Sequence, residues 1–245
     1  YCKEGVLKDD VLLTNATGAY GLALSEHLLA QLLAMMKKLY PYYDNQKKGI
    51  WHDEGSVTSI EDATVLILGA GDIGRAFARR VKALGAYVIG VRRREGAKPF
   101  GIDEMGTMEE LDSLLTRADV VVSVLPGTTV TRGIFDKKRF TAMKKGSYFL
   151  NIGRGNAVVT EDLIEVMKEG RLAGAALDVT DPEPLPADHS LWHTPNIYIT
   201  PHISGDDHLS ATQDKIVQIA ARNLAAFMQG VPLENLVNRT TGYKD

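Results

Sequence analysis

The chain has 245 residues, of which 44% are hydrophobic and 24% charged, with a formal net charge of −3. These values exclude disordered and fibrous classes, and without a basic excess they favour neither nucleic acid nor a membrane as partner. The single cysteine, Cys2, excludes an internal disulfide framework, and no apolar run is long enough for a bilayer span, so a cytoplasmic protein of one large or two unequal domains is expected.

The first predicted element is a helix over Leu22–Leu39, apolar on nearly every side and ending before Pro41. Such a helix must be buried, in a core or between subunits. Short β-rich runs then alternate with helical segments. Strands are predicted at 64–68, 87–91, 119–125, 147–152, 174–179 and 197–200, and helices at 75–84, after Thr107, at 137–145 and at 161–169. A last long helix is predicted over Leu209–Gln229, ended by Gly230.

Continuous apolar strands separated by helices indicate a parallel sheet that is covered on both faces. The predicted fold class is therefore α/β, a doubly wound, Rossmann-like sheet. In such a sheet, ligands bind at the carboxyl ends of the strands.

Three glycines follow the first predicted strand and open the next helix, at Gly69, Gly71 and Gly74. In a dinucleotide site the first glycine makes the tight turn, the second lets the backbone approach the pyrophosphate, and the third packs helix against strand. The helix N-terminus adds N–H groups and a positive dipole end. Because strand, turn and helix all occur in the required order, we expect a dinucleotide cofactor.

The end of the second strand bears on the choice between NAD(H) and NADP(H). After Val91 the chain continues with Arg92, Arg93 and Arg94, and the nearest acid is Glu95. Guanidinium groups pair with a 2′-phosphate, whereas a carboxylate there would repel it. NADP(H) is favoured, with Arg92 and Arg93 as contacts. The alternatives are a solvated surface cluster of arginines and a Glu95 that turns back to a ribose.

Three consecutive strand ends carry Arg154, Glu183 and His202. Singly, each is better explained as a surface or turn residue, but together they suit the reduction of a 2-oxo acid. Arg154 would bind the carboxylate and polarise the carbonyl, and His202 would donate a proton as hydride arrives from the cofactor. Glu183 would orient the imidazole and favour its protonated form.

The sequence resembles the D-isomer-specific 2-hydroxyacid dehydrogenases over nearly its whole length. The resemblance rests on GAGDIGR (69–75), VLPGTT (124–129), NIGRG (151–155), LDVTDPEPLP (177–186) and TPHISG (200–205). It implies that Asp178 holds the nicotinamide carboxamide. The further cofactor residues that it implies are Asp72, Ile73, Arg75, Leu125, Pro126, Ile152, Ser204 and Gly205. No metal ligand is expected.

The resemblance also implies an organisation and a partner. Residues 22–206 would form the dinucleotide-binding domain, and 1–21 with 207–245 a hinge and the remnant of a smaller substrate domain, the chain starting at Tyr1 as an N-terminally shortened form. The helix after Leu22 resembles the family's dimer-forming helix, which predicts a homodimer. Small acids such as glyoxylate or hydroxypyruvate are the expected substrates. The alternatives are a phosphoglycerate dehydrogenase-like enzyme and a dinucleotide-binding corepressor-type protein without turnover.

Overall fold

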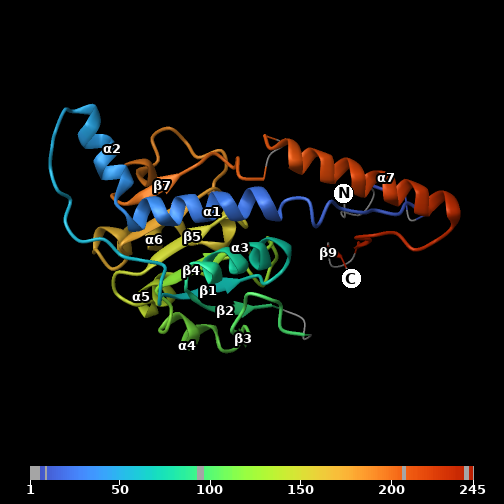
Figure 1. Ribbon diagram of the computed structural model, residues 1–245, viewed down its shortest axis with the longest axis horizontal. Helices are drawn as coiled ribbons and strands as arrows, with labels where there is room; N and C mark the ends of the chain where they lie inside the picture. Colours follow the sequence, from blue (N-terminus) through green and yellow to red (C-terminus); the bar gives the residue numbers. More distant parts are fainter. Residues whose placement is uncertain (1–5, 9, 93–96, 206–207, 240–242, 245) are drawn as a thin grey trace.

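The computed structural model describes residues 6–8, 10–92, 97–205, 208–239 and 243–244. Three sequence predictions fall outside these residues: the cofactor contact of Arg93, the alternative ribose contact of Glu95 and the domain boundary at Asp206. Among the described residues, the main feature is a parallel sheet with helices on both faces (Figure 1).

The sheet has seven strands in the order β3-β2-β1-β4-β5-β6-β7, and every neighbouring pair is parallel. The strand bounds are β1 Thr64–Leu68, β2 Tyr87–Val91, β3 Glu104–Gly106, β4 Val120–Ser123, β5 Tyr148–Asn151, β6 Gly174–Leu177 and β7 Ile197–Ile199. The order reverses direction at β1, between β2 and β4, where a doubly wound sheet places its crevice. The predicted fold class is confirmed.

Alternate side chains of the strands feed two separate cores. On one face, Val65 and Ile67 of β1 pack with α1 (Gly21–Met36) and α3 (Asp72–Ala83). On the other, Leu66 and Leu68 pack with α4, α5 and α6. The bounds of these helices are α4 Leu111–Leu115, α5 Lys137–Ala142 and α6 Thr160–Lys168. Two buried faces explain why the strands read as continuous apolar runs.

The helix predicted over Leu22–Leu39 is shorter than expected. It ends at Met36, Lys38 adopts a left-handed φ of 54°, and a second helix, α2, runs over Leu39–Lys47. Pro41 does not stop this helix, because it lies in the first turn, where no intrahelical N–H bond is required. The prediction of one helix ending before Pro41 was therefore wrong.

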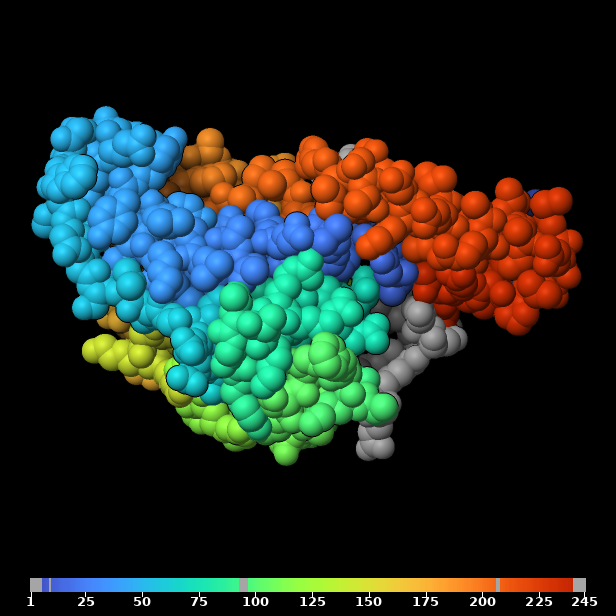
Figure 2. All heavy atoms as spheres, in the orientation of Figure 1, coloured from blue at the N-terminus to red at the C-terminus, as the bar shows by residue number. Residues whose placement is uncertain are grey.

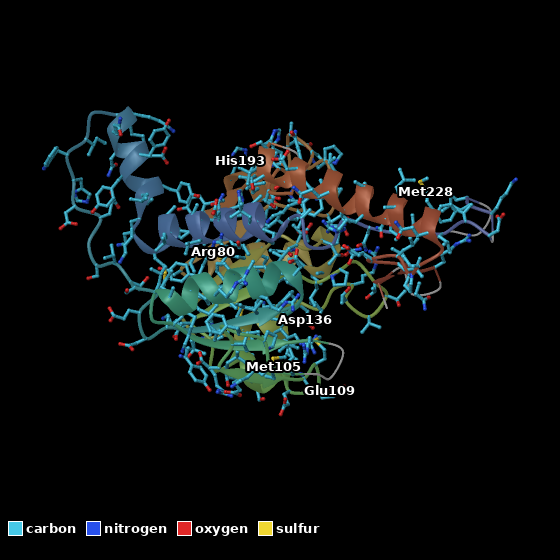
Figure 3. All side chains as sticks on the ribbon, turned by 45° about the vertical axis from the view of Figure 1, so that its right-hand side comes forward. Arg80, Met105, Glu109, Asp136, His193 and Met228 are labelled. Carbon is cyan, nitrogen blue, oxygen red and sulfur yellow. The ribbon has the colours of Figure 1, made fainter. Side chains whose placement is uncertain are left out.

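The apolar character of α1 is largely explained by packing inside the chain. Leu24, Leu28 and Leu32 are buried against α3 and the sheet. Arg80 of α3, labelled in Figure 3, places its Nη2 3.1 Å from Oε1 of Glu26 on α1. The segment that follows α1 consists of α2 and the loop 48–59, and it extends from one end of the molecule (Figures 1 and 2). We call this segment, residues 39–59, the arm.

Two further local predictions need correction. The helix expected directly after Thr107 begins only at Leu111, because Thr107 uses its N–H and hydroxyl to bind the Glu110 carboxylate in a turn of its own. Strand β3 was not predicted. Its three residues, Glu104–Gly106, are too few to show a periodicity, and pairing with β2 defines them.

The final helix, α7, runs over Ser210–Gln229 and ends at Gly230, whose φ is 66°, as predicted. It lies beside the N-terminal segment at one end of the molecule (Figure 1). A single antiparallel bridge joins Thr14 to Leu236, and β8 (Val237–Asn238) pairs with β9 (Tyr243–Lys244). The first and last parts of the chain thus contact each other away from the main sheet.

Candidate active site

The loops after β5, β6 and β7 begin next to one another at the carboxyl edge of the sheet. Asn151 is paired in register with Leu177, and Leu177 with Ile199. Arg154, Glu183 and His202 follow these three strand ends. The sheet therefore places the three predicted catalytic residues in adjoining loops.

Glu183 and His202 form a direct pair. Oε1 of the carboxylate lies 2.5 Å from Nδ1 of the imidazole, and each side chain is about four-tenths exposed. The backbone of His202 has a φ of 54°, and its N–H donates to the carbonyl oxygens of Asp178 (2.8 Å) and Thr200 (3.0 Å). With Nδ1 occupied by Glu183, Nε2 is the nitrogen that can exchange a proton with a substrate.

Arg154 is held through its backbone by Asn151. The Asn151 amide donates to the Arg154 carbonyl oxygen (3.0 Å), and its oxygen accepts the N–H of Gly153 (3.1 Å). One guanidinium nitrogen, Nη1, donates to the Gly153 carbonyl oxygen at 2.6 Å. Arg154 is exposed and has no ion-pair partner in the described part of the chain. The other N–H groups of its planar fork can therefore receive a carboxylate.

The glycines beside Arg154 fix how its loop packs. A Cβ at Gly153 would lie 2.3 Å from the Leu125 carbonyl oxygen, and one at Gly155 would lie 1.9 Å from the Thr180 carbonyl oxygen. Neither distance is physically possible, so only glycine allows the loop to lie against both neighbours. Thr180 is three residues before Glu183, and the Arg154 loop therefore contacts the loop that carries Glu183.

Asp178, directly after β6, supports the neighbouring loop that carries His202. It is 2% exposed, and its carboxylate accepts hydrogen bonds from Thr200 Oγ1, the N–H of Ile203, and both the N–H and Oγ of Ser204. Thr200 also contacts His27 of α1, with 3.2 Å between Oγ1 and Nε2. The contact of Asp178 with a nicotinamide stays a prediction, while its hold on the His202 loop is a structural fact.

His27 and Thr200 were not predicted as site residues. The available signal was a histidine in a largely apolar helix, directly after Glu26. Nothing in the sequence pairs it with Thr200, which lies 173 positions further along the chain.

The glycine-rich turn has the geometry that a dinucleotide requires. Gly69 has a φ of 103°, and a Cβ at Gly74 would lie 2.2 Å from the Gly69 carbonyl oxygen. At Gly71 a Cβ would meet no atom within 4 Å, so open space lies above the start of α3. The described residues provide no side-chain cap at this helix N-terminus. Its N–H groups can therefore bind a pyrophosphate.

Two charged residues of this turn bind the protein itself. The Asp72 carboxylate accepts the N–H of Gly18 at 3.1 Å, so it is turned toward the N-terminal segment. Arg75 donates through Nε to the Gly71 carbonyl oxygen at 3.1 Å. Their predicted roles at the pyrophosphate therefore rest on the Asp72 backbone and on the remaining N–H groups of Arg75.

Arg92 directly follows β2, as the sequence predicted, and its Nη2 donates to the Ala97 carbonyl oxygen at 3.0 Å. The other predicted cofactor residues lie at the same edge of the sheet, Leu125 after β4, Ile152 after β5 and Ser204 in the His202 loop, all buried. Ile73, Pro126 and Gly205 flank them along the chain.

Among the described residues, no group of three or more His, Cys, Asp or Glu side chains is arranged to hold a metal ion. In the same part of the chain, no helix combines the length and the apolar character needed to cross a bilayer.

Comparison with known proteins decides the family. Residues 29–204 match the family described as D-isomer specific 2-hydroxyacid dehydrogenase, NAD binding domain. The chain belongs to this family. The resemblance seen in the sequence is thus confirmed, and the protein is an oxidoreductase of the D-2-hydroxyacid dehydrogenase type.

Individual relatives of this 2-hydroxyacid dehydrogenase include glyoxylate/hydroxypyruvate reductase A of Salmonella choleraesuis, 31% identical over 91% of this chain and 70% of the relative. A family member from Aeromonas salmonicida is 37% identical, with a TM-score of 0.86 over 96% of this chain and 74% of its own. The NADPH-dependent glyoxylate/hydroxypyruvate reductase of Sinorhizobium meliloti, solved with NADP and sulfate, is 33% identical, with a TM-score of 0.85 over 98% of this chain and 75% of its own.

Proposed function

We propose that this 2-hydroxyacid dehydrogenase reduces a small 2-oxo acid to the corresponding 2-hydroxy acid, and catalyses the reverse oxidation, with NADP(H) as cofactor. The observation that carries the proposal is the Glu183–His202 pair, in which Oε1 and Nδ1 lie 2.5 Å apart. The adjoining loop carries Arg154, which has no ion-pair partner among the described residues. One anion receptor and one oriented proton donor are what the reduction of a keto acid needs.

Each of the three side chains has one task. Arg154 binds the substrate carboxylate and places the neighbouring carbonyl. The reduced nicotinamide, when bound, supplies the hydride to the carbonyl carbon. His202 gives a proton from Nε2 to the carbonyl oxygen and accepts it back in the oxidation. Glu183 fixes the imidazole and stabilises its positive charge, acting on His202 and not on the substrate.

NADP(H) is preferred over NAD(H) on two grounds. Arg92 directly follows β2, where the adenosine ribose lies in doubly wound folds, and a guanidinium there attracts a 2′-phosphate. The Sinorhizobium relative was solved with NADP. NAD(H) is the alternative, and the ratio of kcat/KM values for the two reduced cofactors decides between them.

The substrate class is tested by following cofactor oxidation with a panel of acids. Glyoxylate and hydroxypyruvate are expected to be the best substrates, since two relatives carry those names. Preference for a phosphorylated hydroxypyruvate would instead indicate the phosphoglycerate dehydrogenase-like alternative. If no acid is reduced while cofactor still binds, the enzyme proposal is wrong and the corepressor-type reading is favoured.

The protein is proposed to act as a homodimer in the cytosol. α1 buries much of its apolar surface within the chain, but the adjoining arm exposes Leu39, Tyr43, Ile50 and Trp51, the last of these completely. Exposed aromatic and aliphatic side chains in one segment favour a protein interface. Residues 1–21 and 207–245 are assigned to the hinge and the partial substrate domain. Light scattering at micromolar concentration tests the dimer, and a monomer would contradict it.

A further inference from the structure

The loop that carries His202 depends on one buried carboxylate. Asp178 binds three consecutive residues of this loop, because its carbonyl oxygen accepts the N–H of His202 (2.8 Å) and its carboxylate accepts the N–H groups of Ile203 (3.1 Å) and Ser204 (3.0 Å). The main chain of Asp178 therefore holds the backbone of His202, and its carboxylate holds the two residues that follow. A group that fixes the Asp178 carboxylate thus restrains the loop in which His202 lies.

Thr200 is one of the groups that fix Asp178. Its hydroxyl lies 2.5 Å from Oδ1, and because a hydroxyl carries one hydrogen, that hydrogen is used in this bond. Toward any other neighbour, Thr200 Oγ1 can only accept. That neighbour is Nε2 of His27, at 3.2 Å.

His27 must therefore carry its hydrogen on Nε2. Burial lowers the pKa of His27, and the nearby Asp178 raises it by less, so the imidazole is neutral near pH 7 and has a single N–H. The hydrogen bonds then run in one direction, from His27 to Thr200 and from Thr200 to Asp178. The space that these side chains line has no room for a water molecule.

His27 adds a rigid support to this chain of bonds. It lies on α1, between the buried residues Leu24 and Leu28, which pack against α3 and the sheet. Thr200 directly follows β7, and Asp178 directly follows β6. The contact therefore joins the interior helix to the ends of two strands at the point where the His202 loop begins.

We propose that His27 is a positioning residue for the reaction at His202, acting through the hydroxyl of Thr200 and the carboxylate of Asp178. His27 touches no reacting atom in this assignment. Its role rests on the proposed function, because positioning His202 matters for turnover only if His202 transfers the proton. The geometric part, that His27 orders residues 199–205, holds independently of any substrate.

The first test is amide hydrogen exchange of the cofactor-free protein. Replacing His27→Leu removes the donor and keeps the side chain's bulk, and we expect exchange in the segment 199–205 to rise about ten-fold, the effect of losing one hydrogen bond. His27→Gln keeps an N–H donor and is expected to restore most of the protection. The control His193→Leu removes an exposed histidine, labelled in Figure 3, and is expected to leave this segment unchanged.

Two results would overturn the proposal. One is wild-type exchange of 199–205 in His27→Leu. The other is an equal rise in α1 and in the central strands, which would make His27 a packing residue. If His27→Leu does not fold, His27→Met takes its place, because it also lacks an N–H donor and leaves the Thr200–Asp178 bond in place.

The second test is kinetic and separates this inference from the proposed function. In the full protein, His27→Leu is expected to lower kcat about ten-fold while the KM for the keto acid, which depends on Arg154, changes little. A wild-type enzyme that reduces no 2-oxo acid would reject the proposed function, yet the exchange result would still decide the role of His27. A rise in KM with unchanged kcat would show that His27 does not act through His202.

Discussion

Nδ1 of His202 and Oε1 of Glu183 lie 2.5 Å apart, although the two residues belong to loops that leave different strands. The left-handed backbone of His202 and its N–H bonds to Asp178 and Thr200 bring the ring to this position. A non-glycine residue with positive φ is uncommon and persists only where surrounding contacts hold it. The position of His202 is thus held by residues that directly follow strands β6 and β7 of the sheet.

Replacing His202→Ala is expected to lower kcat by roughly two to four orders of magnitude, the usual contribution of general acid catalysis. The measurement is steady-state reduction of the best 2-oxo acid, beside a fluorescence titration with NADPH. Glu183→Gln keeps the imidazole of His202, so its kcat should fall by less than that of His202→Ala. A matching loss of NADPH affinity in His202→Ala would show a structural role instead.

Arg154→Lys keeps the positive charge but loses the planar guanidinium group, which can bind a carboxylate through two N–H donors. We expect the KM for the keto acid to rise about ten- to one-hundred-fold, because hydrogen bonds to a charged group contribute about 1.5–3 kcal/mol. The KM for NADPH should hardly change. An unaltered KM for the acid would place the carboxylate elsewhere.

Gly71→Ala is expected to weaken cofactor binding, whereas Gly74→Ala is expected to destabilise the fold. A Cβ at Gly71 meets no protein atom within 4 Å, so the melting temperature should stay near that of the wild type while the cofactor dissociation constant rises. A Cβ at Gly74 would lie 2.2 Å from the Gly69 carbonyl oxygen, so this variant should be strongly destabilised. Thermal denaturation and NADPH titration of both variants test the contrast, and equal melting temperatures would refute it.

Arg92→Asp is expected to shift preference toward NADH. The substitution removes a cation that attracts the 2′-phosphate and adds a carboxylate that can bind the ribose hydroxyl groups. The quantity to measure is kcat/KM for NADPH divided by that for NADH. If this ratio does not change, Arg92 lies outside the cofactor site.

Folding stability is expected to depend on pH through His27. Because burial lowers the folded-state pKa of His27, the unfolded chain binds a proton first as the pH falls below about 6.5. The native state therefore loses stability from about pH 6.5 down to the folded-state pKa, and keeps it at higher pH. Urea denaturation at pH 7.5 and 5.5 should show a smaller loss for His27→Gln than for the wild type. An equal loss in the two proteins would contradict the assignment.

By itself, the sequence determined the strands of the sheet other than β3, the glycine-rich turn and the three catalytic candidates. Each of these has a local signal: apolar runs, a strand followed by spaced glycines, or a polar residue in the loop that follows a strand. A parallel sheet brings consecutive strand ends to one edge, so the sequence alone predicts that Arg154, Glu183 and His202 lie together. The break between α1 and α2 was missed because Pro41 is tolerated in a first turn.

Only the tertiary structure decided which groups support the site. His27 and Thr200 are 173 positions apart, and their contact exists because α1 packs against β5 and β6. The fit of Gly155 against Thr180 is likewise set by the approach of two loops. Such contacts depend on long-range packing, which no local periodicity encodes, and the positioning of His202 therefore became visible only in the folded chain.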